Sequence, residues 1–359
     1  MRKNQSKKWQ LLTAGIMMSV CTSCFTALPV WAAEYNEPLT GDFYDDSDIL
    51  ENDGNTVKLD KAANTITYDF QGQDHTFTVK NDDGITASQG DKYRYIFNNV
   101  GADGSKGTLH IYQSNNQFNP YAGVNGFVAS GGKVTVNSNL DITATSDYAS
   151  TGVTVANGAD LVINGNVKMR KDDPSSPWGI ITKNVHGNVG PGGAVTMDGG
   201  YDANYTGARW QPSAFNVGYT RGNITVNGDV DITANGNGLH TNGNGSVITV
   251  NGGGAITIND SSTKGAYAAM RADNGTINMN VALDGSKATA GLGKDVVLKG
   301  NLAATNGTSD AAASIINVAL DTEKSALEGV AYMAGNNSQI NLWLQNGASW
   351  TNEVHGSAE

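Results

Sequence analysis

Short stretches in which apolar and polar residues alternate recur along most of the chain after residue 120. Pairs such as Val134/Val136 and Ile224/Val226 place their apolar side chains on one face of an extended strand. Each stretch leads into a turn, most often of the Asn-Gly type, and then into a second alternating stretch. The pattern therefore predicts a repeating unit of strand, turn and strand.

Copies of this unit recur at a spacing that distinguishes between two architectures. They begin at Gly131, Gly158, Gly192, Arg221 and Gly245, with weaker copies at Gly275, Lys294 and Gln339. The turn residues of the five clear copies are separated by 27, 34, 29 and 24 residues; they are Asn137, Asn164, Asp198, Asn227 and Asn251. A third apolar piece lies between copies, at 152–155, 215–217 and 267–270. An array of antiparallel hairpins would repeat a strand every eight to twelve residues or so, without a longer period. Three strands per longer repeat instead favour an all-β, right-handed parallel β-helix.

The Asn-Gly turns are expected to be structural. Asn and Gly adopt the left-handed backbone conformation that a sharp turn needs more easily than other residues do. In a stacked helix, asparagines at equivalent turns align, so their side-chain amides are expected to bond to one another as a ladder.

The first 32 residues have the layout of a secretory signal peptide. Basic residues are followed by an apolar run that starts at Leu11 and by small residues at a cleavage site predicted after Ala32. A membrane anchor is the alternative, but Thr and Ser interrupt the apolar run. Both cysteines, Cys21 and Cys24, lie inside this segment. The mature chain is therefore expected to be exported and free of cysteine, at the cell surface or outside the cell.

Two further regions follow the signal. Residues 33–120 are acidic at their start and richer in Tyr and Phe, which predicts an N-terminal cap with atypical first turns of the helix, because an open solenoid end exposes its core. Residues 121–359 form the predicted repeat region.

Composition and charge exclude several classes of function. The chain carries 23 basic and 34 acidic residues, a net charge of −11, which argues against a nucleic-acid partner and against an anionic membrane surface. None of the usual nucleophile, phosphate-loop or zinc motifs is present, and the five histidines are far apart in the sequence. We expect no catalytic, cofactor or metal site.

The chain resembles the passenger region of bacterial autotransporters. The features that carry the resemblance are the VTVNGDVDIT type of repeat, the exported cysteine-free chain and the late segment INLWL with NGASW at 346–350, so it covers roughly residues 120–359. It implies a right-handed β-helix acting in adhesion, aggregation or surface presentation, with host or bacterial surface proteins or glycans as partners. Autotransporters end in an outer-membrane barrel, and nothing after Ser349 is similar to one. Anchoring to the outer membrane would therefore depend on a barrel that is not in this chain.

Two stretches interrupt the repeat and are the places where partner binding is expected, because insertions in repeat proteins form loops on one face. The candidate residues there are Arg170, Trp178, Tyr205, Arg209 and Trp210. A passive structural stalk is one alternative. The other is a β-helix polysaccharide lyase or hydrolase, which would need carboxylates gathered on one face beside a base. The nearest such cluster in the sequence is Arg170, Lys171, Asp172 and Asp173.

Overall fold

The described part of the chain is a right-handed parallel β-helix with three strands in each turn. The computed structural model describes 34–35, 39–40, 57–80, 84–87, 93–115, 124–146, 150–171, 213–217, 222–234, 236–242, 244–259, 267–285, 287–305 and 313–353. Within these ranges there is no helix with the length and apolar character that a membrane span requires. The predicted signal peptide lies outside the described residues.

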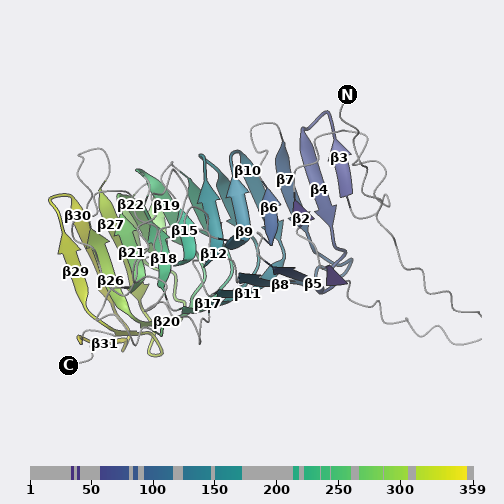
Figure 1. Ribbon diagram of the computed structural model, residues 1–359. Coiled ribbons are helices and arrows are strands. Elements are labelled where there is room, and N and C mark those ends of the chain that lie inside the picture. The colour runs from purple at the N-terminus through teal and green to yellow at the C-terminus, as the bar shows by residue number, and fades with distance from the viewer. Residues whose placement is uncertain are drawn as a thin grey trace, which may run out of the picture. The chain divides into compact units, whose positions relative to one another are not determined.

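Three long sheets hold almost all of the strands, and in each sheet the strands follow one another in chain order (Figure 1). Sheet A consists of β1 (Glu34–Tyr35), β5 (His75–Lys80), β8 (Thr108–Asn115), β11 (Asn139–Ser146), β14 (Val167–Lys171), β17 (Val230–Ala234), β20 (Gly254–Ile258), β25 (Val296–Lys299), β28 (Ala326–Glu328) and β31 (Ser349–Thr351). Sheet B consists of β2 (Leu39–Thr40), β6 (Ile85–Ala87), β9 (Val124–Ser130), β12 (Ser150–Ala156), β15 (Ser213–Val217), β18 (Asn237–Thr241), β21 (Ala268–Asp273), β26 (Asn301–Thr305) and β29 (Ala331–Ala334). Sheet C consists of β3 (Val57–Asp60), β4 (Thr65–Asp69), β7 (Arg94–Asn98), β10 (Lys133–Asn137), β13 (Asp160–Ile163), β16 (Asn223–Val226), β19 (Ser246–Val250), β22 (Gly275–Met279), β27 (Ser314–Leu320) and β30 (Ser338–Leu344).

Each turn of the helix passes from sheet B to sheet C and then to sheet A. The predicted strand-turn-strand unit is the pair formed by a sheet C strand and the following sheet A strand, as in β10 and β11. The third apolar piece is the sheet B strand: residues 152–155 lie in β12 and 215–217 in β15. The repeat inferred from the sequence is thereby confirmed for the copies that begin at Gly131, Gly158, Arg221, Gly245 and Gln339, with parallel pairing and three faces. The weak copy at Lys294 instead covers β25 of sheet A and β26 of sheet B, and the copy at Gly192 lies outside the described residues.

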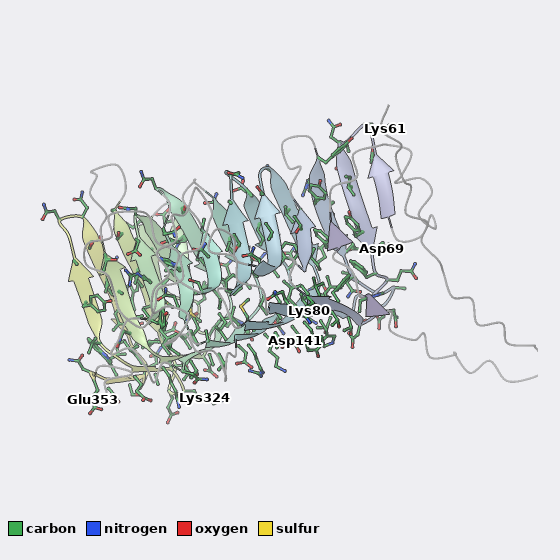
Figure 2. All side chains as sticks on the ribbon, viewed as in Figure 1. Lys61, Asp69, Lys80, Asp141, Lys324 and Glu353 are labelled. Atoms are coloured by element: carbon green, nitrogen blue, oxygen red, sulfur yellow. The ribbon has the colours of Figure 1, made fainter. Side chains whose placement is uncertain are left out.

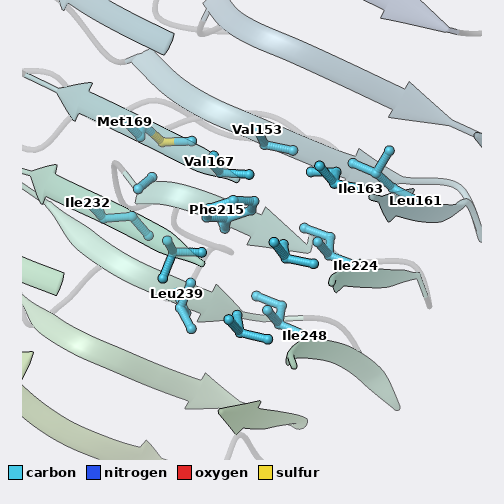
Figure 3. Packing of buried hydrophobic residues seen from close by; sticks show 14 of the residues in the cluster. Val153, Leu161, Ile163, Val167, Met169, Phe215, Ile224, Ile232, Leu239 and Ile248 are labelled. Carbon is cyan, nitrogen blue, oxygen red and sulfur yellow. The ribbon is translucent and has the colours of Figure 1, made fainter. Parts of the chain in front are cut away.

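The core consists of columns of apolar side chains, one from each successive turn of the helix. Leu161, Ile224 and Ile248 occupy one register position on sheet C, and Phe215 and Leu239 are cross-strand partners on sheet B (Figure 3). All five are essentially inaccessible to solvent. Burying each side chain of this size contributes about 1.5–3 kcal/mol, but only when the neighbouring turn is present to cover it.

The predicted asparagine ladder is present at the end of the sheet C strands. Its donor–acceptor distances are 2.8 Å from Asn164 Nδ2 to Asn137 Oδ1, 2.7 Å from Asn227 to Asn164, and 2.7 Å from Asn251 to Asn227. Asp198, which the sequence places in the same series, lies outside the described residues.

The conformational reason expected for these Asn-Gly pairs is wrong. Neither the ladder asparagines nor the glycines that follow three of them, Gly165, Gly228 and Gly252, have a positive φ. The glycines are needed because successive turns approach closely: a Cβ on Gly228 would lie 2.3 Å from the carbonyl oxygen of Gly165, and one on Gly252 would lie 2.2 Å from that of Gly228. The left-handed conformation occurs elsewhere, for example at Asn157 and Asn274.

One hairpin interrupts the regular succession of strands. Strands β23 (Val281–Asp284) and β24 (Lys287–Gly291) pair antiparallel between β22 and β25. The buried amide of Asn280 holds its base, because Nδ2 donates to Asp321 Oδ1 at 2.8 Å and Oδ1 accepts the N–H groups of Leu292 and Lys294 at 3.2 Å. The hairpin lies between the weak copies of the repeat expected at Gly275 and Lys294, and it was not predicted from the sequence.

The described residues of the region 33–120 contribute strands to the same three sheets. Strand β3 differs from the others, because it pairs antiparallel with β4 at the first edge of sheet C. The sheets continue from β8 to β11 in sheet A and from β6 to β9 in sheet B, so the pairing shows no break near residue 120.

Candidate functional site

A single column of outward side chains crosses sheet A. Strand register places His110, Asp141, Lys168 and Asp231 at equivalent positions on β8, β11, β14 and β17. The column continues with Ala255 and Val297 on β20 and β25. Side chains alternate between the two faces of a strand, and the neighbours Leu140 and Ile142 of Asp141 are buried in the core. The column therefore lies on the outer face.

These residues line a groove of about 560 Å³. It crosses six strands of sheet A, from Thr108 on β8 to Val297 on β25. Figure 2 shows Asp141 and Lys324 on the face of the β-helix that is formed by sheet A. Along its length the groove changes from charged residues at β11 to β17 to small apolar residues at β20 and β25.

Cationic side chains compensate three of the four carboxylates in this groove. Lys168 Nζ lies 3.7 Å from Asp141 Oδ2, Arg170 Nη2 lies 3.7 Å from Asp231 Oδ2, and Lys324 Nζ lies 3.8 Å from Asp295 Oδ2. These are long contacts between partly exposed groups, and surface pairs of this kind are worth at most about 1 kcal/mol. They can therefore exchange partners with a bound molecule at little cost.

The fourth carboxylate belongs to a second column, which fixes the turns entering sheet A. Asn139 Oδ1 accepts the N–H of Asn166 at 3.0 Å, Asn166 Oδ1 accepts the N–H of Asp229 at 3.1 Å, and Asp229 Oδ1 accepts the N–H of Gly253 at 2.8 Å. Each side chain thus caps the backbone of the next turn. This second ladder holds one wall of the groove in register.

Of the partner-binding residues predicted from the sequence, the structure describes one. Arg170 lies on β14 beside the groove and pairs with Asp231. Trp178, Tyr205, Arg209 and Trp210 lie outside the described residues, as do Asp172 and Asp173. Asp141, Lys168 and Asp231 were not predicted as site residues, because the outward positions of successive repeats carry different residue types. Alignment of the copies by their turn asparagines would have placed these residues in one column.

A second polar cluster lies on sheet B and was also missed. His240 Nε2 lies 3.1 Å from Asp273 Oδ2, and His240 Nδ1 lies 3.3 Å from Ser213 Oγ. Arg271 Nε donates to the same Asp273 oxygen at 2.7 Å, and Thr305 donates to the other carboxylate oxygen. The sequence did not predict this cluster, because the residues that contact His240 are 27 and 33 positions away.

Burial dominates the electrostatics of this cluster. It lowers the pKa of His240, which Asp273 raises again only in part. Burial also opposes ionisation of Asp273, but Arg271 and His240 together hold the pKa of Asp273 below its usual value. Ser213 and His240 are almost completely enclosed, so the described arrangement is a buried hydrogen-bond network rather than an open active site.

Among the described residues no three His, Cys, Asp or Glu side chains gather closely enough to hold a metal ion. Comparisons of the chain with protein-family models, with curated proteins and with solved structures found no match.

Proposed function

We propose that this protein is an exported β-helical passenger that acts at the cell surface in adhesion, aggregation or surface presentation, and that it makes its contacts through the outer face of sheet A. The observation that carries the proposal is the groove itself. It crosses six strands and combines partly exposed ion pairs with apolar residues at one end. The basic, apolar and small-residue layout of residues 1–32 supports export, and the acidic surface supports an extracellular environment.

The experiment that tests this function uses cells. The native locus is tagged after residue 32, the cells are fractionated, and autoaggregation and surface binding are scored against a deletion strain. We expect surface-displayed protein, loss of adhesion in the deletion strain, and reduced adhesion in the double variant Asp141→Asn/Asp231→Asn. The matched control is Asp284→Asn, an exposed carboxylate on the β23–β24 hairpin. Surface display with no adhesion defect in the deletion strain would favour a passive stalk instead.

A polysaccharide lyase or hydrolase is the second candidate, because the structure places carboxylates on one face beside Arg170. Asp141 and Asp231 lie on either side of Lys168 in one column, and Arg170 contacts Asp231. A pair of carboxyl groups supplies the acid and the base for hydrolysis of a glycosidic bond. Release of reducing ends or unsaturated products from a polysaccharide panel, abolished by Asp231→Asn, would establish this candidate over adhesion alone.

A further inference from the structure

Two carboxylates of the groove on sheet A lie two strands apart in one column. They are Asp141 on β11 and Asp231 on β17, with Lys168 on β14 between them. Parallel strands lie about 4.8 Å apart, so equivalent positions two strands apart are separated by about 9.6 Å. That separation is close to the disaccharide repeat of an extended β-1,4-linked glycan.

The charges that line the groove favour a neutral polymer over a polyanionic one. Because Lys168, Arg170 and Lys324 face Asp141, Asp231 and Asp295, the groove presents donors and acceptors side by side with little excess charge. A polyanionic chain such as a uronate polymer would meet four carboxylates and gain no uncompensated cation. A neutral chain can share its hydroxyl groups between Asp and Lys or Arg through charge-assisted hydrogen bonds.

The apolar end of the groove fits the same kind of ligand. Ala255 and Val297 continue the column beyond Asp231 and form a small apolar patch on β20 and β25, next to Asp295. The C–H face of a sugar ring can lie against such a surface without losing hydrogen bonds.

We infer that the groove binds a linear, uncharged glycan that runs across the strands of sheet A, with its disaccharide repeat matched to two turns of the β-helix. This rests on the proposed function and specifies its ligand class. The six strands span about 24 Å at the usual strand spacing. The affinity is therefore expected to rise with chain length up to four or five sugars and then to level off.

The test uses the full exported protein and fluorescent end-labelled oligosaccharides in a polarisation titration. The neutral probes are cellohexaose, xylohexaose and N-acetylchitohexaose, the anionic probe is hexagalacturonate, and the basic probe is hexalysine. We expect at least one neutral hexamer to bind tenfold or more tightly than the anionic and basic probes. Because the ligand is uncharged, raising the salt concentration should change its Kd less than about twofold.

Two groove variants and one control complete the test. Asp231→Asn and Ala255→Asp should each weaken binding of the neutral hexamer by about tenfold, whereas Asp284→Asn should leave it unchanged. Thermal melting of each variant shows whether it has folded. Preference for hexagalacturonate or hexalysine, or neutral-glycan binding that neither groove variant changes, would overturn the inference.

The outcome in cells separates this inference from the proposed function. Adhesion that depends on Asp141 and Asp231 without glycan binding by the purified protein would retain the function and reject the ligand class. Glycan binding by a protein that is not displayed on cells would retain the ligand class and reject the proposed function at the cell surface.

Discussion

The side-chain amide of Asn227 donates a 2.7 Å hydrogen bond to Asn164, although 63 residues separate them in the sequence. The strands before these residues pair in register, Leu161 with Ile224 and Ile163 with Val226. The long insertion that begins after β14 is therefore accommodated without loss of register between successive turns. The ladder identifies which turns are neighbours even where the spacing of the repeat is irregular.

Removal of one ladder amide should destabilise the helix. Asn164→Ala removes the hydrogen bonds to Asn137 and from Asn227, each worth about 1 kcal/mol. We expect the free energy of unfolding, measured by urea denaturation, to fall by about 1–2 kcal/mol. Asn244→Ala, in an exposed turn, is the control and should have little effect. Equal stability of the two variants would show that the ladder contributes nothing.

The glycines of the repeat should fall into two classes that alanine substitution separates. Gly228→Ala places a Cβ 2.3 Å from a neighbouring carbonyl oxygen, whereas Gly245→Ala meets no atom within 4 Å but keeps a φ of +68°. Gly245→Ala should therefore lose only about 1–2 kcal/mol of stability, the cost of a left-handed backbone for a residue with a Cβ. Gly228→Ala requires the backbones of two turns to separate, so its urea midpoint should fall further. The reverse order would contradict the close-approach explanation.

Stability should fall as the pH drops from neutral. The pKa of buried His240 is lowered from about 6.5, so the unfolded chain binds a proton more readily than the folded chain does. The stabilising contribution is complete above about pH 6.5 and is lost as the pH falls toward the folded pKa. Asp273, whose pKa is also lowered, adds a further loss below about pH 3.8.

Urea midpoints between pH 8 and pH 5 measure this effect. His240→Gln should reduce the slope with pH, and His110→Gln on sheet A is the matched control. Burial also lowers the pKa of His75, so the slope should be reduced and not abolished. An unchanged slope in His240→Gln would contradict the assignment.

Loss of a groove ion pair should affect binding without affecting folding. The side chains of Arg170 and Asp231 are 43% and 57% exposed and lie 3.7 Å apart. Surface pairs of this kind contribute at most about 1 kcal/mol. Arg170→Gln should therefore change the melting temperature by only a few degrees or less while it weakens surface binding. A large loss of stability would mean that Arg170 supports the fold instead of the groove.

The fold was predictable because its signals repeat. Alternation such as Val134/Val136 recurs at the spacing of one turn, and the asparagines that end the sheet C strands mark the register. The groove was not predictable in the same way, because Asp141, Lys168 and Asp231 share a position but not a residue type. The β23–β24 hairpin was not predicted because the alternation of Val281 and Leu283 is also typical of a strand within the parallel β-helix. The contact between His240 and Asp273 depends on the stacking of turns, which no local pattern shows.

The ladder has a chemical consequence as well as a mechanical one. Asn-Gly sequences lose ammonia readily, because the glycine nitrogen attacks the side-chain carbonyl carbon and closes a succinimide ring. Asn164, Asn227 and Asn251 all precede glycine, but their amides are held by neighbours and the following glycines pack against the previous turn too closely to accept even a Cβ. The contacts that fix the register are therefore expected to slow deamidation at these residues as well.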